Sequence, residues 1–387
     1  MQFPNTISSK LPHVGYSIFT TMSKLAGEQN AINLSQGFPD FPCNPKLVSL
    51  INKYMKKGYN QYAPMAGILT LREAIANKTN KLYQAFYNPE TEITITAGAT
   101  QGIFTTINAL VQSGDEVIIF SPSYDCYQPA VQLAGATTVY VNLTYPSFSP
   151  DWEMLKKAIN YKTRLIMINS PHNPSGFVWA KSDFEKLDQI VKGKDIFVLS
   201  DEVYEHIVFD NHKHYSACHF PDLAKRTIIV GSFGKTFHVT GWKMGYVIAP
   251  ENISAEIRKV HQFLVFSANT PIQYAFAEYM QEEDHYLQVS EFYETKRDYF
   301  LNMLNNKNLG FTPTLGTYFQ LIDCSKISLK SDVETAKELT IKNKIASIPV
   351  SVFYGDGTDN KLLRFCFAKE ISVLEKAASI LNSLQVN

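Results

Sequence analysis

Short apolar runs rich in isoleucine and valine alternate with helix-like segments through the middle of this 387-residue chain. Several runs lack the polar alternation of a half-exposed strand, which is typical of strands covered on both faces. Helical patterns lie between them at 101–112 and 181–191. This order predicts an α/β fold in which helices cover both faces of a mostly parallel, seven-stranded sheet. The predicted strands are 92–96, 116–120, 137–141, 165–169, 197–200, 227–231 and 245–249.

The pattern changes after residue 271, where a smaller α+β unit is predicted. A long helix is expected over 272–304, broken near Asp284. It is followed by strand-like runs at 318–322, 346–349 and 362–367 and by helical patterns at 333–343 and 373–384. The length suits more than one domain. We predict an N-terminal arm that includes part of the small domain (1–38), a large domain (39–280) and a small C-terminal domain (281–387).

Charge and cysteine usage exclude several classes of function. Lys plus Arg and Asp plus Glu are 36 each, so the net charge gives no reason to expect nucleic acid or an anionic membrane as partner. No signal peptide and no apolar run of about 20 residues is visible. The five cysteines are far apart and form no CxxC pair, so we predict neither a disulfide framework nor a metal site, and a cytoplasmic protein.

The segment SFGKT, residues 232–236, directly follows the apolar run 227–231. A lysine in such a glycine-containing loop can hold its amine close to a cofactor, with Ser232 and Lys243 near enough for a phosphate. A lysine desolvated beside a second cation has a lowered pKa, which suits Schiff-base chemistry. Without these neighbours, Lys235 would be an ordinary solvated lysine.

Three further segments place polar groups at strand ends. Asp201 follows the apolar run 197–200, where a buried carboxylate needs a partner. A protonated pyridine nitrogen would be such a partner and would make the ring an electron sink; the other interpretation is a helix N-cap. In the loop NSPHNPSG, Asn173 could donate to a ring oxygen, whereas His172 more often packs or caps. Residues 98–102 could bind phosphate through free backbone N–H groups.

Together these segments resemble the fold-type I pyridoxal 5'-phosphate (PLP) aminotransferases of class I/II, in order and over nearly the whole chain. The resemblance is specific at SFGKTFHVTGWKMGY, NSPHNPSG and SDEVYEH. Four other segments are similar to the branch of kynurenine aminotransferase (glutamine transaminase K) and the bacterial methionine aminotransferases. They are NLSQGFPDF, NQY, SPSYDCY and IPVSVFY. The resemblance implies cis bonds before Pro122 and Pro174.

The resemblance also implies a role for each matching residue around PLP. Lys235 would form the Schiff base and shuttle the proton, and Asp201 would pair the pyridine nitrogen. Asn173 and Tyr204 would hydrogen-bond the phenolic ring oxygen, and Tyr124 would stack on the ring. The phosphate would be held by Ala99, Thr100, Ser232 and Lys243, where Lys243 stands in place of the arginine of many members, and by Tyr62 of the partner subunit. A homodimer is therefore implied.

The substrate site follows from the same resemblance. Arg364 would clamp the α-carboxylate with its bidentate fork, assisted by Gly37 and Asn173. Aspartate-selective members carry a further arginine, for which this chain offers no candidate. The expected pocket lining is apolar and aromatic and comprises Tyr16, Phe19, Tyr62, Tyr124 and Phe353. We therefore expect transamination of a large uncharged L-amino acid, methionine or aromatic first, with a 2-oxo acid.

Four alternative functions remain open. The first two would use the same PLP-binding residues, and the last two would not depend on their catalysis. A kynurenine or glutamine transaminase needs only a different side-chain preference. A PLP cysteine-conjugate β-lyase, or a relative of aminocyclopropane-carboxylate synthase, would expel a leaving group instead of returning a proton. The ligand-sensing domain of a bacterial transcription factor is disfavoured because the pattern begins within the first forty residues. An α/β protein without cofactor is the remaining alternative.

Overall fold

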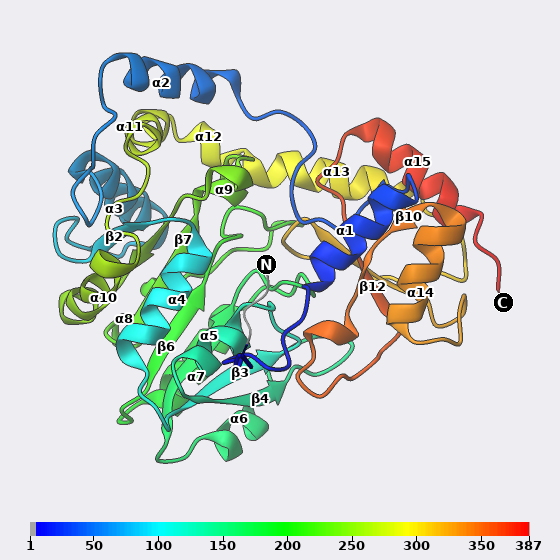
Figure 1. Ribbon diagram of the computed structural model, residues 1–387, viewed down its shortest axis with the longest axis horizontal. Coiled ribbons are helices and arrows are strands. Elements are labelled where there is room, and N and C mark those ends of the chain that lie inside the picture. The colour runs from blue at the N-terminus through cyan, green and yellow to red at the C-terminus, as the bar shows by residue number, and fades with distance from the viewer. Residues whose placement is uncertain (1–4, 387) are drawn as a thin grey trace.

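A computed structural model describes residues 5–386 (Figure 1). Its large sheet has seven strands in the order β2-β8-β7-β6-β5-β3-β4. All pairs are parallel except those of β8, which runs antiparallel to β2 and β7. All seven predicted strands are present, and the predicted fold class is confirmed. The strands are Ile93–Thr96 (β2), Glu116–Ser121 (β3), Thr137–Asn142 (β4), Thr163–Asn169 (β5), Phe197–Asp201 (β6), Thr227–Ser232 (β7) and Gly245–Ile248 (β8).

Alternate residues of the large sheet enter apolar clusters on its two opposite faces. In β3, Ile118 belongs to the cluster that contains Phe184 of α7, whereas Ile119 belongs to the cluster that contains Ile107 of α4. Both faces are thus covered by helices, which explains why these strands show no polar alternation. The helices of the first 280 residues are Ile18–Glu28 (α1), Pro45–Lys56 (α2), Leu69–Tyr83 (α3), Ala99–Leu110 (α4), Tyr127–Leu133 (α5), Trp152–Ala158 (α6), Lys181–Val191 (α7), Pro221–Ala224 (α8), Phe233–Thr236 (α9), Glu251–Leu264 (α10) and Thr270–Tyr279 (α11).

A smaller unit is built on two short sheets. One is the antiparallel sheet β11-β12-β9, and the other pairs β1 with β10 in parallel. Figure 1 shows α1 beside β10, although β10 lies more than 300 residues later in the chain. The elements are Ile32–Asn33 (β1), Asp284–Leu287 (α12), Val289–Met303 (α13), Phe319–Asp323 (β9), Asp332–Glu338 (α14), Ile345–Ala346 (β10), Ile348–Pro349 (β11), Leu362–Cys366 (β12) and Ile371–Asn382 (α15).

One prediction for this unit was wrong in detail. The single strand expected at 346–349 is two strands, β10 and β11, that belong to different sheets. The break expected near Asp284 in the long helix predicted over 272–304 is present, because α11 ends at Tyr279, α12 begins at Asp284 and α13 begins at Val289. His285 stacks on Tyr279 at 3.6 Å and its Nδ1 bonds the Tyr279 carbonyl at 2.8 Å, so the chain folds back at the end of α11. The domain boundaries stay a prediction.

A buried polar network lies between α3 and the large sheet. Lys78 forms an ion pair with Glu205, and both side chains are at most 7% exposed. The Tyr246 hydroxyl donates to Glu205 at 2.7 Å and accepts from Lys78 at 2.8 Å, while Tyr83 donates to Glu205 at 2.8 Å. A β-carbon at Gly231 would overlap the Tyr246 ring. Glycine in β7 is therefore what allows Tyr246 to reach the ion pair.

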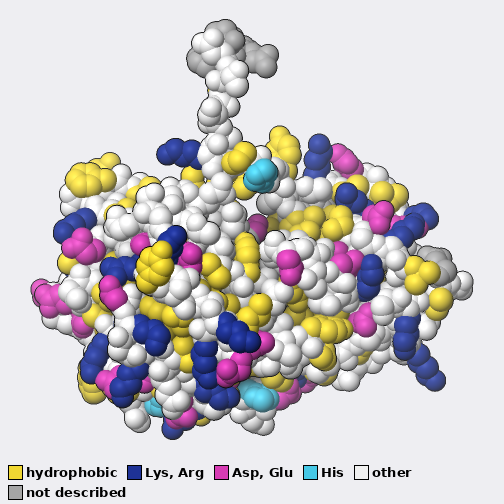
Figure 2. All heavy atoms as spheres, turned by 90° about the horizontal axis from the view of Figure 1, so that it is seen from below, with side chains coloured by type: hydrophobic (Ala, Val, Ile, Leu, Met, Phe, Trp, Pro, Cys, Tyr) yellow, Lys and Arg dark blue, Asp and Glu magenta, His cyan; other side chains and the backbone are white. Residues whose placement is uncertain are grey.

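The surface of the molecule carries charges of both signs. Basic and acidic side chains intermingle on the face drawn in Figure 2, in line with the balanced charge. Within residues 5–386, no helix has both the length and the apolar character needed to cross a membrane.

Candidate active site

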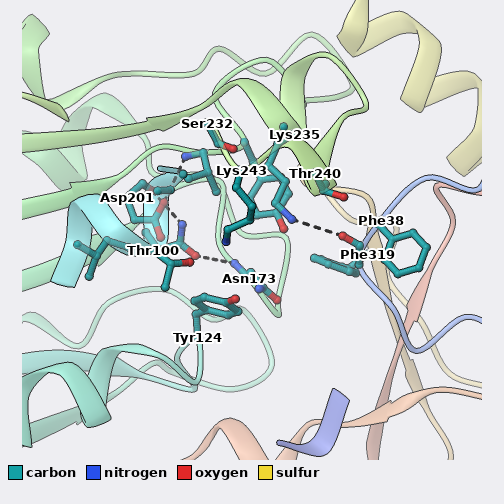
Figure 3. Close-up of a pocket in the computed structure, with 18 of the residues that line it drawn as sticks. Phe38, Thr100, Tyr124, Asn173, Asp201, Ser232, Lys235, Thr240, Lys243 and Phe319 are labelled. Carbon is teal, nitrogen blue, oxygen red and sulfur yellow. Dashed lines mark hydrogen bonds between the residues drawn. The ribbon is translucent and has the colours of Figure 1, made fainter. Parts of the chain in front are cut away.

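Most of the residues predicted to bind a cofactor or substrate, Lys235, Asp201, Asn173 and Arg364 among them, line one cavity of about 310 Å³ (Figure 3). It opens where β2, β5, β6 and β7 meet the loops that follow them, and the small unit closes it with Phe319 and Arg364. Loops after strands are the usual place for a ligand in an open α/β sheet. The described lining residues are Phe19, Gln36, Gly37, Phe38, Gly98, Ala99, Thr100, Ile103, Tyr124, Asn169, Asn173, Asp201, Val203, Tyr204, Ser232, Gly234, Lys235, Thr240, Lys243, Met244, Phe319 and Arg364.

Lys235 sits on the short helix α9, directly after β7. Burial, aided by the nearby cations Arg364 and Lys243, lowers the pKa of Lys235 to about 8. Its Nζ donates to the Tyr318 hydroxyl at 3.0 Å and to the Gly37 carbonyl at 3.4 Å. An amine in this environment loses its proton near neutral pH and can then act as a nucleophile or base. Tyr318 was not among the predicted site residues.

Asp201 ends β6 and is 4% exposed. Burial raises the pKa of Asp201 to about 6, and the Tyr127 hydroxyl, which donates to its Oδ2 at 2.5 Å, opposes that rise. The backbone N–H of Val203 donates to Oδ1 at 3.3 Å. A buried carboxylate held this way fits a cationic ring nitrogen as partner. Tyr127 was also missed, because nothing in its sequence environment separates it from a packing tyrosine.

A phosphate-sized cradle surrounds the N-terminus of α4. Helix α4 begins at Ala99, so the first backbone N–H groups have no partner within the helix. Gly98 has φ +83°, and its missing β-carbon would lie 3.5 Å from Lys243 Cε. A β-carbon at Gly245 would lie 2.8 Å from the Ala99 nitrogen. The backbone therefore comes close on every side, and Ser232 and Lys243 add a hydroxyl and a cation.

Arg364 lies in the centre of the small antiparallel sheet and is 1% exposed. Its guanidinium stacks 3.9 Å from the centroid of the Phe319 ring and lies 5.2 and 5.3 Å from those of Phe19 and Phe353. Nη1 donates to Asn173 Oδ1 at 2.6 Å. Among the described residues, Nε has no hydrogen-bond partner. A buried guanidinium with an unused donor fits a carboxylate from a ligand.

The contact with Arg364 also fixes the orientation of Asn173. Because its Oδ1 accepts from the guanidinium, its amide N–H groups are left to donate elsewhere. Its backbone N–H donates to Asn169 Oδ1 at 2.8 Å, which holds the loop in place. This geometry fits donation to a phenolate oxygen of a bound ring.

Other predicted residues lie outside the cavity lining. Tyr16 is 92% exposed and Tyr62 is 83% exposed, where its ring contacts Phe266 at 5.3 Å. Phe353 is buried behind the lining, 5.9 Å from Phe19. His172 is buried between the Pro122 carbonyl and the Ser175 hydroxyl, and burial lowers its pKa to about 4. His172 is therefore a packing residue, as a histidine in such a loop usually is.

The expected cis bonds before Pro122 and Pro174 are present. Two more cis bonds precede Pro146 and Pro171. Three of the four lie in the loops after β3 and β5 that border the cavity.

Comparison with known proteins shows the family to which the chain belongs. The model of the family "Aminotransferase class I and II" matches residues 29–381. Methionine aminotransferase of Escherichia coli (strain K12) is 50% identical over 97% of this chain and 98% of its own length. A crystal structure of an E. coli protein with a methionine aminotransferase function superposes with a TM-score of 0.96 at 49% identity, covering 98% of this chain and 100% of that one.

More distant relatives share the same fold. Human kynurenine–oxoglutarate transaminase 3 is 33% identical over 100% of this chain and 92% of its own length. Aspartate aminotransferase from Thermus thermophilus has a TM-score of 0.90 at 28% identity and covers 98% of this chain and 99% of that chain.

The sheet, the buried amine, the buried carboxylate and the phosphate cradle define a PLP-dependent enzyme of fold type I. The chain belongs to the aminotransferase class I and II family. The residues present fit PLP: the buried Asp201 carboxyl would suit its ring nitrogen, the amide N–H groups of Asn173 its ring oxygen and the Lys243 ammonium its phosphate.

Proposed function

We propose that this enzyme transaminates large uncharged L-amino acids, with methionine or aromatic amino acids preferred, using a 2-oxo acid as acceptor. The observation that carries the preference is the set of cations in the cavity. Among its described lining residues these are Lys235, Lys243 and Arg364, and each already has a role. A side-chain carboxylate would therefore find no further cation among the described lining residues, which disfavours aspartate.

The aromatic lining suits a thioether or an aromatic ring. Phe19 and Phe353 flank Arg364, and Tyr124 lies 6.5 Å from Phe19 between ring centroids. Methionine sulfur makes favourable contacts with aromatic rings. Discrimination among such side chains is weak, about 1–3 kcal/mol per methylene-sized difference. The expected result is a broad range of substrates.

Two of the relatives support a large uncharged substrate. The E. coli relative at 50% identity is a methionine aminotransferase, and the human relative at 33% identity is a kynurenine–oxoglutarate transaminase. Methionine is a thioether amino acid and kynurenine an aromatic one. A large uncharged side chain is therefore common to the substrates that name these two relatives.

Each residue has a task in the proposed reaction. PLP, when bound, supplies the electron sink that accepts the electron pair left at the substrate α-carbon. Asp201 would hold the ring nitrogen in its protonated form, and Asn173 and Tyr204 would donate to the ring oxygen. Tyr124 would stack on the ring, while Ala99, Thr100, Ser232 and Lys243 would hold the phosphate.

Substrate orientation and proton transfer fall to two other groups. Arg364 would hold the α-carboxylate, with Gly37 and Asn173 beside it, so that the α-hydrogen faces Lys235. The neutral Nζ of Lys235 would take that proton as general base. Holding the reacting atoms in this way is worth several orders of magnitude in rate.

We also propose a cytoplasmic homodimer in which Tyr62 of the partner subunit completes the phosphate site. Exposed apolar side chains lie near Tyr62. Phe266 contacts its ring, and Phe263 of the adjoining helix α10 is 86% exposed. Residues 5–9 are exposed, and the first of them stand away from the body of the chain, in a position to reach a neighbour (Figure 2), whereas the Lys10 carbonyl accepts from Gln132 at 3.0 Å. The five cysteines are all free, which suits a reducing compartment.

A panel of amino donors tests the proposed substrate preference. kcat/KM is measured for methionine, phenylalanine, kynurenine, glutamine and aspartate with one common 2-oxo acid. We expect methionine or an aromatic donor to lead and aspartate to be at least about 100-fold slower. Aspartate in front would contradict the assignment. Release of pyruvate and thiol from a cysteine conjugate, faster than any transamination, would favour a β-lyase instead.

A further inference from the structure

The hydroxyl of Tyr318 is the closest hydrogen-bond partner of the Lys235 amine within the described chain. Lys235 Nζ donates to Tyr318 Oη at 3.0 Å, and Tyr318 Oη donates to the Gly37 carbonyl at 2.7 Å. Tyr318 is 0% exposed and directly precedes β9 in the small unit. Figure 3 shows the Lys235 amine directed toward the side of the cavity that Phe38 and Phe319 line. Three segments far apart in the sequence thus meet at one nitrogen.

The direction of these bonds determines where the lone pair of the amine points. Because the Tyr318 proton is given to Gly37, its oxygen is left to accept from Lys235. A neutral amine has two N–H bonds and one lone pair. Here one N–H faces Tyr318 and the other faces Gly37, at 3.4 Å. Both N–H bonds are occupied on one side, so the lone pair is turned away from them.

Tyr318 also contacts Tyr204, and it directly precedes the residue on which Arg364 stacks. Its ring stands perpendicular to that of Tyr204, with centroids 5.3 Å apart. The next residue, Phe319, is the ring on which Arg364 stacks. A change in the position of Tyr318 would therefore alter the amine relative to the group that holds the substrate.

We propose that Tyr318 is a positioning residue for proton transfer, which orients the free amine of Lys235 so that its lone pair faces the substrate α-carbon. The proposal rests on the proposed transamination. In the step concerned, the Cα–H bond breaks, its proton joins the Nζ lone pair, and the electron pair stays with the carbon. The resulting ammonium keeps its N–H contacts with Tyr318 and Gly37, and the third N–H carries the transferred proton.

The test compares two matched variants, Tyr318→Phe and Tyr293→Phe. Tyr293 is also 0% exposed, and its ring lies 5.5 Å from that of Tyr318. Its hydroxyl has no partner among the described residues, so it is the appropriate control. Each full-length enzyme is loaded with pyridoxamine phosphate, which leaves Lys235 free. Acetylation of Lys235 by trace acetic anhydride is then followed from pH 6 to 10 by mass spectrometry.

Loss of an acceptor for the ammonium form should lower the acetylation midpoint of Tyr318→Phe by about one pH unit. In a separate measurement, single-turnover reaction of the PLP-loaded enzyme with the best amino acid of the donor panel should slow about 10-fold to 100-fold, with a larger isotope effect for the α-deuterated substrate. Tyr293→Phe should match the parent enzyme in both measurements.

Two results would overturn the proposal. One is an unchanged midpoint and an unchanged isotope effect in Tyr318→Phe. The other is a lowered Tm with an unchanged midpoint, which would make the hydroxyl a purely structural group. The acetylation midpoint involves no substrate, so a wrong substrate assignment would leave that readout intact and the two failures can be told apart.

Discussion

Asparagine in place of Asp201 should stabilise the cofactor-free protein at alkaline pH while abolishing transamination. Burial raises the pKa of this carboxyl from 3.8 to about 6, against the opposing effect of the Tyr127 hydroxyl. The folded state therefore binds this proton more tightly than the unfolded state. Its contribution to stability is fully present below pH 3.8 and is lost as the pH rises through 6. The difference of about 2 pH units corresponds to about 3 kcal/mol.

Asp201→Asn carries no charge to bury and can still accept from Tyr127. Its gain in the free energy of unfolding should therefore reach about 3 kcal/mol at pH 8 and fall to about half of that at pH 5. This gain is measured by urea unfolding of both cofactor-free proteins at one fixed protein concentration. Adding PLP at pH 8 should stabilise the parent more than the variant, since only the parent offers a carboxylate to the ring nitrogen.

The control for this experiment is Asp284→Asn. Asp284 is exposed, and the same substitution there should change the free energy of unfolding by less than about 0.5 kcal/mol at either pH. The reasoning is refuted if Asp201→Asn is no more stable than the parent at pH 8. It is equally refuted if the gain is the same at pH 5 and pH 8, because a pH-independent gain cannot come from a carboxyl group.

Three other substitutions probe separate parts of the molecule. Arg364→Lys should lower kcat/KM for the best amino donor about 10-fold to 150-fold, because one charge-assisted bond of the fork is lost; a change below threefold would contradict the clamp. Tyr127→Phe removes the donor to Asp201 and should raise the pKa of that carboxyl, moving the pH dependence of PLP binding upward by about 1–2 pH units. An unmoved profile would exclude Tyr127 as a support. Lys78→Met leaves Glu205 buried without its cation and should cost about 3–5 kcal/mol in urea unfolding, part of which Lys78→Met with Glu205→Gln should recover. Equal losses in the single and double variants would be evidence against the pair.

The strands of the large sheet could be predicted because they are rich in apolar residues, which are buried on both faces in every strand except the half-exposed edge strand β4. Short elements of the small unit were harder. Whether residues 345–349 form one strand or two depends on their partners, β1 for Ile345 and β12 for Ile348, and these lie far away in the sequence. Helix α2 was not predicted, although Asn44 caps it and Pro45 opens it, because it has few buried residues.

For the site, motifs predicted the residues that we propose to hold the cofactor and that the structure brings to one cavity, but not the residues that contact and support them. Lys235, Asp201 and Asn173 stand in segments whose composition is itself informative. Tyr127 and Tyr318 are two of 21 tyrosines, and only tertiary contacts separate them from packing residues. The exposed position of Tyr62 fits the proposed role at the phosphate site of a partner subunit.

The glycine of β7 that lies beneath the Tyr246 ring restricts how this chain can evolve. Any side chain at Gly231 would displace the ring and take its hydroxyl away from the buried Lys78–Glu205 pair. A smaller residue at Tyr246 would make room at Gly231, but it would first leave that pair without its hydroxyl. Neither position can change alone without loss, so the two are expected to be inherited together, and sequences that differ at one should differ at the other.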